Sequence, residues 1–124
     1  RSQALWVKAG VSRFDGRLLN NQGADLTGAS TLVLGTDGNS FEVTGVVAID
    51  LISNVGWQEG SIITLIFNSG GGVNHGTATS GTNITVLLSA SANFGASAND
   101  TLTLILSSTT AGGQAWREVC RTAI

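Results

Sequence analysis

Short apolar or alternating runs, each ended by turn-forming residues, constrain this chain more than any other feature. Glycine, asparagine, serine or aspartate separates each run from the next, and the 124 residues include no proline. Runs of this kind at intervals of about ten residues are typical of an all-β domain. The runs cover residues 31–35, 41–52, 61–68, 82–90, 101–107 and 114–122.

The pattern inside the runs predicts which strand faces are buried. Residues 41–44 and 47–51 alternate apolar and polar side chains, which indicates strands with one face in water. Residues 61–67 are apolar at nearly every position, which predicts a strand buried on both sides, one of them against another subunit. We therefore expect a jelly-roll-like antiparallel β-sandwich. An up-and-down barrel is less favoured, because several strands are too apolar on both faces.

The first thirty residues differ from the rest of the chain. They hold four of the six basic residues, and their glycines at 10, 16 and 23 argue against a long helix. We expect an extended N-terminal arm over residues 1–30 and a β-sandwich domain over residues 31–124. The large apolar side chains of such an arm need a surface to cover, so we predict that it is an attachment segment. The predicted attachment residues are Leu5, Trp6, Val7 and Phe14.

Charged residues are unusually few, at 11% of the chain compared with about 25% in a typical soluble domain. This deficit indicates that other subunits cover part of the surface, as in a homotrimer. The net charge is −2 and the basic residues are scattered, which argues against a nucleic-acid groove. No apolar stretch approaches the roughly 20 residues of a membrane-spanning helix, so we expect no membrane insertion.

The residue types that carry catalysis or bind metals are sparse. His75 is the only histidine and Cys120 the only cysteine, so we expect neither a structural zinc site nor an internal disulfide. Cys120 lies in an alternating apolar run and is predicted to be a small core residue. The eight acidic residues lie mostly in turns or on polar strand faces, and no catalytic pair stands out. We therefore predict a protein that is not an enzyme and takes no cofactor or metal.

The tryptophans are the best candidates for recognition, because aromatic faces stack on sugars and anchor protein interfaces. Trp116 in the last run is predicted to pack in the core, whereas Trp57 lies among turn residues. Trp57 together with Asn74 and His75 forms the predicted ligand-facing set. A sugar is the ligand class expected for that set.

Six short motifs are arranged in a recognisable order. They are GNSFEVTG at 38–45, GWQEGS at 56–61, ITLIF at 63–67, VNHG at 73–76, NDTLTL at 99–104 and WRE at 116–118. In this order they resemble a small β domain of tailed-bacteriophage virion proteins. That domain is found at the ends of tail fibres and tailspikes, and in head fibres and capsid decoration proteins. The resemblance covers about residues 31–122 and none of residues 1–30.

The resemblance implies a homotrimeric virion surface protein in which Trp57, Gly60, Phe67 and Trp116 are framework residues. Its implied partners are further copies of itself and the major capsid protein or other virion proteins. Assembly in the host cytoplasm agrees with the unpaired Cys120. Tail fibres usually continue from a long shaft, which this sequence does not show. We therefore expect a fragment of a fibre, or a free-standing decoration or cement protein. The alternative is a host-glycan receptor-binding module of a tail fibre or tailspike.

Overall fold

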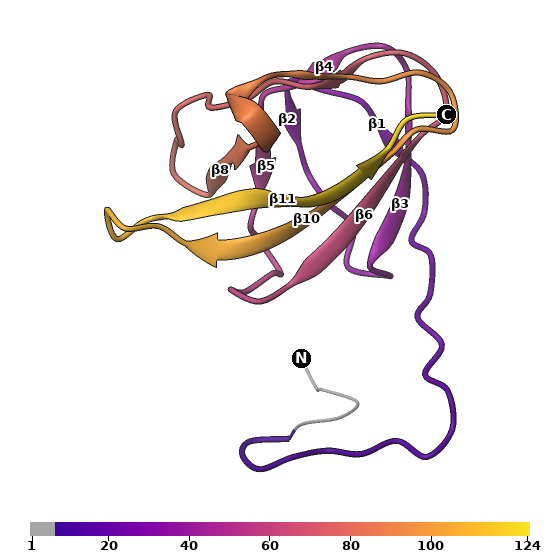
Figure 1. Cartoon of the computed structure of the whole chain (residues 1–124), viewed down its shortest axis with the longest axis vertical. Coiled ribbons are helices and arrows are strands. Elements are labelled where there is room, and N and C mark those ends of the chain that lie inside the picture. The colour runs from indigo at the N-terminus through magenta and orange to yellow at the C-terminus, as the bar shows by residue number, and fades with distance from the viewer. Residues whose placement is uncertain (1–6) are drawn as a thin grey trace.

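The computed structural model describes residues 7–124, and its main element is an eight-stranded sheet (Figure 1). The strands lie in the order β1-β3-β6-β10-β11-β8-β5-β2. They are β1 (Leu26–Thr27), β2 (Thr31–Leu32), β3 (Ser40–Thr44), β5 (Leu51–Ser53), β6 (Ile62–Phe67), β8 (Asn83–Leu87), β10 (Thr101–Ser108) and β11 (Gln114–Thr122). The predicted all-β class is confirmed.

The sheet curls until it nearly closes into a barrel. Its two edge strands, β1 and β2, are neighbours in the sequence, and the three residues between them cross the seam. The Gly28 N–H donates to the Thr44 carbonyl at 2.8 Å on one side of the seam. On the other side, the Ser30 carbonyl accepts from the Asp50 N–H at 2.8 Å and the Leu51 N–H at 3.0 Å. These bonds cover sheet edges that would otherwise be open to pairing.

A second, three-stranded sheet packs on the same core. It consists of β4 (Ala48–Ile49), β7 (Gly72–Val73) and β9 (Phe94–Gly95), in the order β4-β7-β9. Its apolar side chains Ile49, Val73 and Phe94 are buried in the core cluster. The short helical turn η1 (Ser89–Ser91) precedes β9. Within residues 7–124, no helix is long and apolar enough to cross a membrane.

The sheets are mixed, so the prediction of an antiparallel arrangement is wrong in part. β10 pairs antiparallel with β6 and β11, and β8 with β5. Parallel pairs join β1 to β3, β3 to β6, β2 to β5, β8 to β11 and β4 to β7. Parallel neighbours require a long connection, and here the connection contains other strands. The turn residues predicted the breaks between strands, but they carry no information about strand direction across such connections.

The core forms from one face of each long strand. β3, β8 and β10 alternate buried and partly exposed residues, as the sequence predicts for strands with one wet face. β6 does the same: Ile63 and Leu65 are buried, but Ile62 is 50% exposed. In the single chain this strand is therefore buried on one side only, and no other described element covers its second face. The predicted cover by another subunit stays a prediction.

Candidate functional site

The arm, defined from here on as residues 7–20, extends away from the barrel (Figure 1). All of its residues are exposed. Of the predicted attachment residues, Val7 and Phe14 lie on this arm, and Leu5 and Trp6 lie outside the described residues. The exposed fractions of its large apolar residues are Val7 55%, Val11 99%, Phe14 57%, Leu18 65% and Leu19 75%. On residues 7–20 the structure thus offers five large apolar side chains for attachment, two of which, Val7 and Phe14, the sequence had singled out.

The C-terminal end of the arm joins the domain at a firmly held point beside β3. The Asn21 side-chain amide donates to the Asp37 carbonyl at 2.7 Å, and the Gly23 N–H donates to the Ser40 carbonyl at 2.8 Å. A Cβ on Gly38 would lie 2.2 Å from the Asn21 carbonyl oxygen, so only glycine permits this approach. Since residues 21–30 pair with the barrel, the segment that stands free of the domain ends at Asn20.

Trp57 lies in the loop between β5 and β6 and is half-buried. Its ring stands edge-on to Phe41 and Trp116, at 6.4 Å between centroids in each case. Trp116 is fully buried, as predicted, and its indole N–H donates to the Ile52 carbonyl at 3.2 Å. The indole N–H of Trp57 is buried as well, but it meets no acceptor among the described residues. Trp57 therefore serves the core and keeps one unused donor.

A small cavity lies beside Trp57. Its volume is about 400 Å³, and it is lined by Thr36, Gly38, Asn39, Gly56 and Trp57. Neither Asn74 nor His75 lines it, so the structure does not bring the three predicted ligand-facing residues together in this cavity. A ligand in this cavity would meet one aromatic side chain, that of Trp57, and several polar groups.

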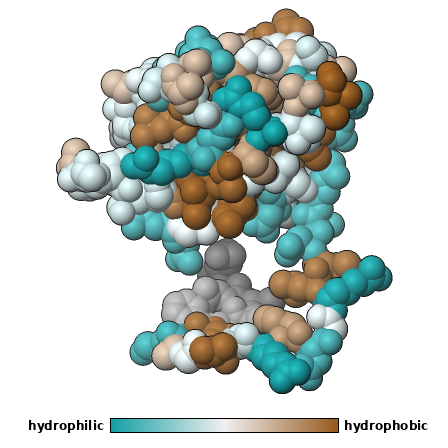
Figure 2. All heavy atoms as spheres, viewed as in Figure 1, coloured by the Kyte–Doolittle hydropathy of each residue, from teal (hydrophilic) through white to brown (hydrophobic). Residues whose placement is uncertain are grey.

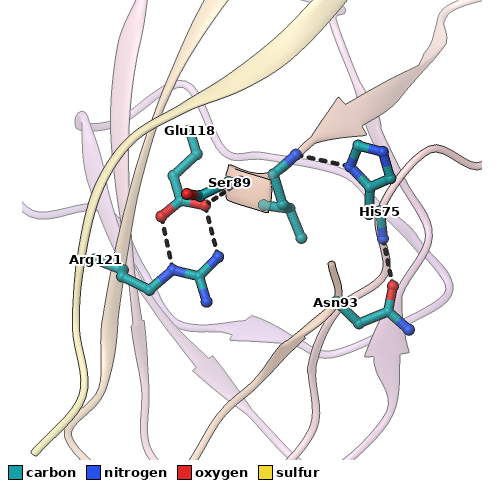
Figure 3. Close-up of polar contacts among 6 residues, drawn as sticks. His75, Ser89, Asn93, Glu118 and Arg121 are labelled. Atoms are coloured by element: carbon teal, nitrogen blue, oxygen red, sulfur yellow. Dashed lines mark hydrogen bonds and ion pairs between the residues drawn. The ribbon is translucent and has the colours of Figure 1, made fainter. Parts of the chain in front are cut away.

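Asn74 and His75 both make hydrogen bonds that hold loops, and Figure 3 shows those of His75. The Asn74 side-chain amide donates to Asp50 Oδ1 at 2.7 Å. His75 Nδ1 accepts a hydrogen bond from the Leu88 N–H at 2.9 Å, and the His75 N–H donates to Asn93 Oδ1 at 2.8 Å. These contacts hold the loop after β7 against the end of β8, which is a structural role for both residues.

Glu118 and Arg121 form the most strongly bonded ion pair in the described chain (Figure 3). Two guanidinium nitrogens of Arg121, Nε and Nη2, donate to the two carboxylate oxygens of Glu118 at 2.7 and 2.6 Å. The Ser89 N–H donates to the same carboxylate at 2.8 Å. The Arg121 hydrogen bonds hold the pKa of Glu118 below its ordinary value of 4.5. The Arg121 guanidinium also lies 4.7 Å from the centre of the Phe94 ring. The pair therefore ties β11 to η1 and β9.

Side chains suited to metal binding are not grouped in residues 7–124. No three His, Cys, Asp or Glu side chains in this range are grouped to hold a metal ion. Cys120 is exposed on β11, so its prediction as a core residue is wrong. The cause is a β-bulge: the pairing of β10 with β11 shifts between Thr103 and Leu104, which adds one residue and reverses the alternation after Glu118.

An open sheet face lies on the barrel exterior, and Figure 2 shows apolar atoms gathered there over β6 and β10. Ile62 lies opposite Ile105, Thr64 opposite Thr103, and Ile66 opposite Thr101. The outer face is defined as these six residues and Val119, the extra residue of the bulge, which is 54% exposed. The near-continuous apolar run at 61–67 was its only signal in the sequence, because the contributions of β10 and β11 depend on register.

No family model, curated protein or solved structure matches this chain.

Proposed function

We propose that the chain is a non-enzymatic structural protein of a tailed-phage virion, a homotrimer of jelly-roll-like β domains on the particle surface. In this role the arm attaches the domain to the major capsid protein or to another virion protein. The protein assembles in the host cytoplasm and is then displayed at the virion surface. The observation that carries the proposal is the arm, whose large apolar side chains have no cover of their own.

The chemistry of the arm suits attachment to another protein. Full burial of a valine, leucine or phenylalanine side chain contributes about 1.5–3 kcal/mol. Four such side chains therefore supply roughly the 8 kcal/mol of a micromolar complex, before the costs of association are subtracted. Three basic residues and one acidic residue in the arm favour an acidic partner surface. An extended segment of this kind binds by adding a strand or by filling an apolar groove.

The positions of the phage-like motifs support a framework role for them. The motif at 38–45 contains β3, the motif at 63–67 lies within β6, and the motif at 116–118 lies within β11. Phe67 and Trp116 are buried, with exposed fractions of 1% and 0%. A resemblance carried by core residues bears on the fold of a displayed domain rather than on a reaction.

Particles of a phage that encodes the chain provide the test. Particles lacking the gene are incubated with the purified full chain, or with a chain that begins at Asn21, and then washed and sedimented. We expect the full chain to sediment with the particles and the shorter chain to remain in the supernatant. Absence of the full chain from washed particles, including particles that carry the gene, would overturn the proposal.

The alternative is a host-glycan receptor-binding module, and one observation favours it. The indole N–H of Trp57 has no acceptor among the described residues, and the Trp57 side chain lines a cavity of about 400 Å³. A sugar hydroxyl can accept such a hydrogen bond while its ring stacks on the indole. A glycan array with the full chain and with Trp57→Phe tests this role, since phenylalanine keeps an aromatic ring and removes the donor. Equal binding by both proteins, or none by either, would exclude this role for Trp57.

A further inference from the structure

Two of the three hydroxyls of the outer face already bond each other. They are the Thr64 and Thr103 hydroxyls at its centre, 2.9 Å apart, and removal of water leaves this hydrogen bond in place. Around this pair lie the apolar side chains of Ile62, Ile66 and Ile105. A sheet face of this composition resembles the centre of a protein interface, where charged residues are depleted.

The free arm starts at one corner of the outer face. An open groove of about 510 Å³ lies there, lined by Asn20 at the end of the arm, by Ile62 and Thr64 of the outer face, and by Asn39, Ser40, Gly60 and Ser61. From Asn20 the arm runs away from its own barrel (Figure 1). Its 14 residues span at most about 50 Å when extended. Neighbouring strands in a sheet lie only about 5 Å apart, so the strands of the outer face span much less than the extended length of the arm. The arm is therefore long enough to cross the same face of an adjacent copy.

The arm and the domain carry complementary charge. Residues 31–124 contain six acidic and two basic residues, and residues 7–20 contain three basic and one acidic. Lys8 and Arg17 make no ion pair with any described residue. Glu42 borders the outer face, since β3 places it opposite Ile66. A basic apolar arm therefore fits an acidic domain with an apolar sheet face, and one chain supplies both.

We infer that the arm of a second copy of this chain lies across the outer face, so that each copy donates one arm and accepts another. Such head-to-tail contacts form a closed ring when the rotation between copies closes. The inference rests on the proposed function, because it assigns the surface that joins the copies of the surface oligomer. The groove beside Asn20 leads the accepted arm onto Ile62 and Thr64.

Single lysine substitutions in the full chain test both halves of the contact. Leu18→Lys changes the arm, Ile105→Lys changes the outer face, and Val55→Lys is the matched control on an exposed turn residue that belongs to neither. Sedimentation at several micromolar concentrations measures association, and circular dichroism checks the fold. We expect Leu18→Lys and Ile105→Lys each to weaken association at least tenfold, and Val55→Lys to leave it unchanged.

Cys120 provides a second readout, since it is exposed and lies opposite Thr103 of the outer face. We expect maleimide to label this thiol at least tenfold more slowly in the associated wild-type chain than in Leu18→Lys, whose substitution is far away in the sequence. If Ile105→Lys dissociates the oligomer but Leu18→Lys neither dissociates it nor exposes Cys120, the outer faces pair directly and the inference is overturned.

A wild-type chain that stays monomeric at all concentrations also overturns the inference. If that monomer still binds phage particles through its arm, the proposed attachment role stands and only the exchange between copies fails. A monomer in which Cys120 is protected until Leu18 is changed would show that the arm folds back onto its own barrel, which likewise contradicts the inference.

Discussion

Two phenylalanines, Phe14 and Phe41, summarise the difference between the arm and the barrel. Phe41 is fully buried in β3, whereas Phe14 is 57% exposed on an extended segment. Both segments contain large apolar residues, but only in the barrel do regular strands place them on a covered side. Apolar content alone therefore does not predict a core. An apolar residue without a covered face indicates binding to another molecule more than folding of its own domain.

Gly72 and Gly10 give the sharpest version of this comparison. Both have positive φ, +128° and +90°, but a Cβ on Gly72 would lie 1.9 Å from the Phe94 carbonyl oxygen, and one on Gly10 would meet nothing within 4 Å. Because alanine at 72 must push β7 from β9, we expect Gly72→Ala to lower the free energy of unfolding by at least about 4 kcal/mol. Gly10→Ala should change it by less than about 0.5 kcal/mol. Urea denaturation measures both, and equal losses would refute a separate arm.

The phenylalanine pair tests the same separation through packing. We expect Phe41→Ala to cost about 3–4 kcal/mol, since it removes a fully buried ring and leaves a cavity beside Trp57. Phe14→Ala should leave the unfolding of the domain unchanged and weaken attachment to its partner. Thermal unfolding of dilute samples, in which association does not contribute, gives the first comparison. A large loss for Phe14→Ala under these conditions would mean that the arm packs on its own barrel.

The smallest expected effect concerns two carboxylates that accept from an arginine. Glu118 has its pKa lowered mainly by its Arg121 hydrogen bonds, whereas Asp15 pairs with Arg13 at 2.7 Å with both side chains more than 80% exposed. We expect Glu118→Gln to cost about 1–2 kcal/mol at pH 7 and Asp15→Asn to cost almost nothing. A carboxylate with a lowered pKa stabilises the fold above its unfolded pKa and loses that contribution as pH falls through the folded value.

The pH dependence of that difference is a further check. The gap between wild type and Glu118→Gln should be full at pH 7 and shrink as pH falls below about 4.5, the ordinary pKa of a glutamic acid. Asp100, whose pKa is lowered by hydrogen bonds from the Ile124 and Ser97 N–H groups, titrates in both proteins and therefore cancels. Denaturation at a series of pH values measures the gap. A gap that stays constant from pH 7 to pH 3 would show that the charge of Glu118 does not stabilise the fold.

The sequence predicted the elements whose signal is local. β10 and β11 lie within one residue of the predicted runs, and Trp116 is in the core as expected. The two-residue strands β1, β7 and β9 escaped prediction, because so short a pairing leaves no period in the sequence. Cys120 was misplaced because a bulge reverses alternation without altering composition.

The arm and the outer face also differ in whether their residues lie close together in the sequence. The apolar residues of the arm lie within one continuous stretch of the sequence, so composition alone could draw attention to them. Their role in attachment stays a prediction. The outer face joins residues 62–66 to residues 101–105 and 119, and only the strand register brings them together. Asn74 and His75 could not be separated from ligand-binding residues by sequence, because their hydrogen bonds to Asp50, Leu88 and Asn93 depend on the fold.

The central claim is that residues 21–124 form the fold and residues 7–20 carry the association. The most direct measurement is the native mass of the full chain and of a chain that begins at Asn21, with circular dichroism recorded on both. The account predicts an oligomer for the full chain and a folded monomer for the shorter one. The same number of copies in the native particle of both chains, or an unfolded shorter chain, would contradict it.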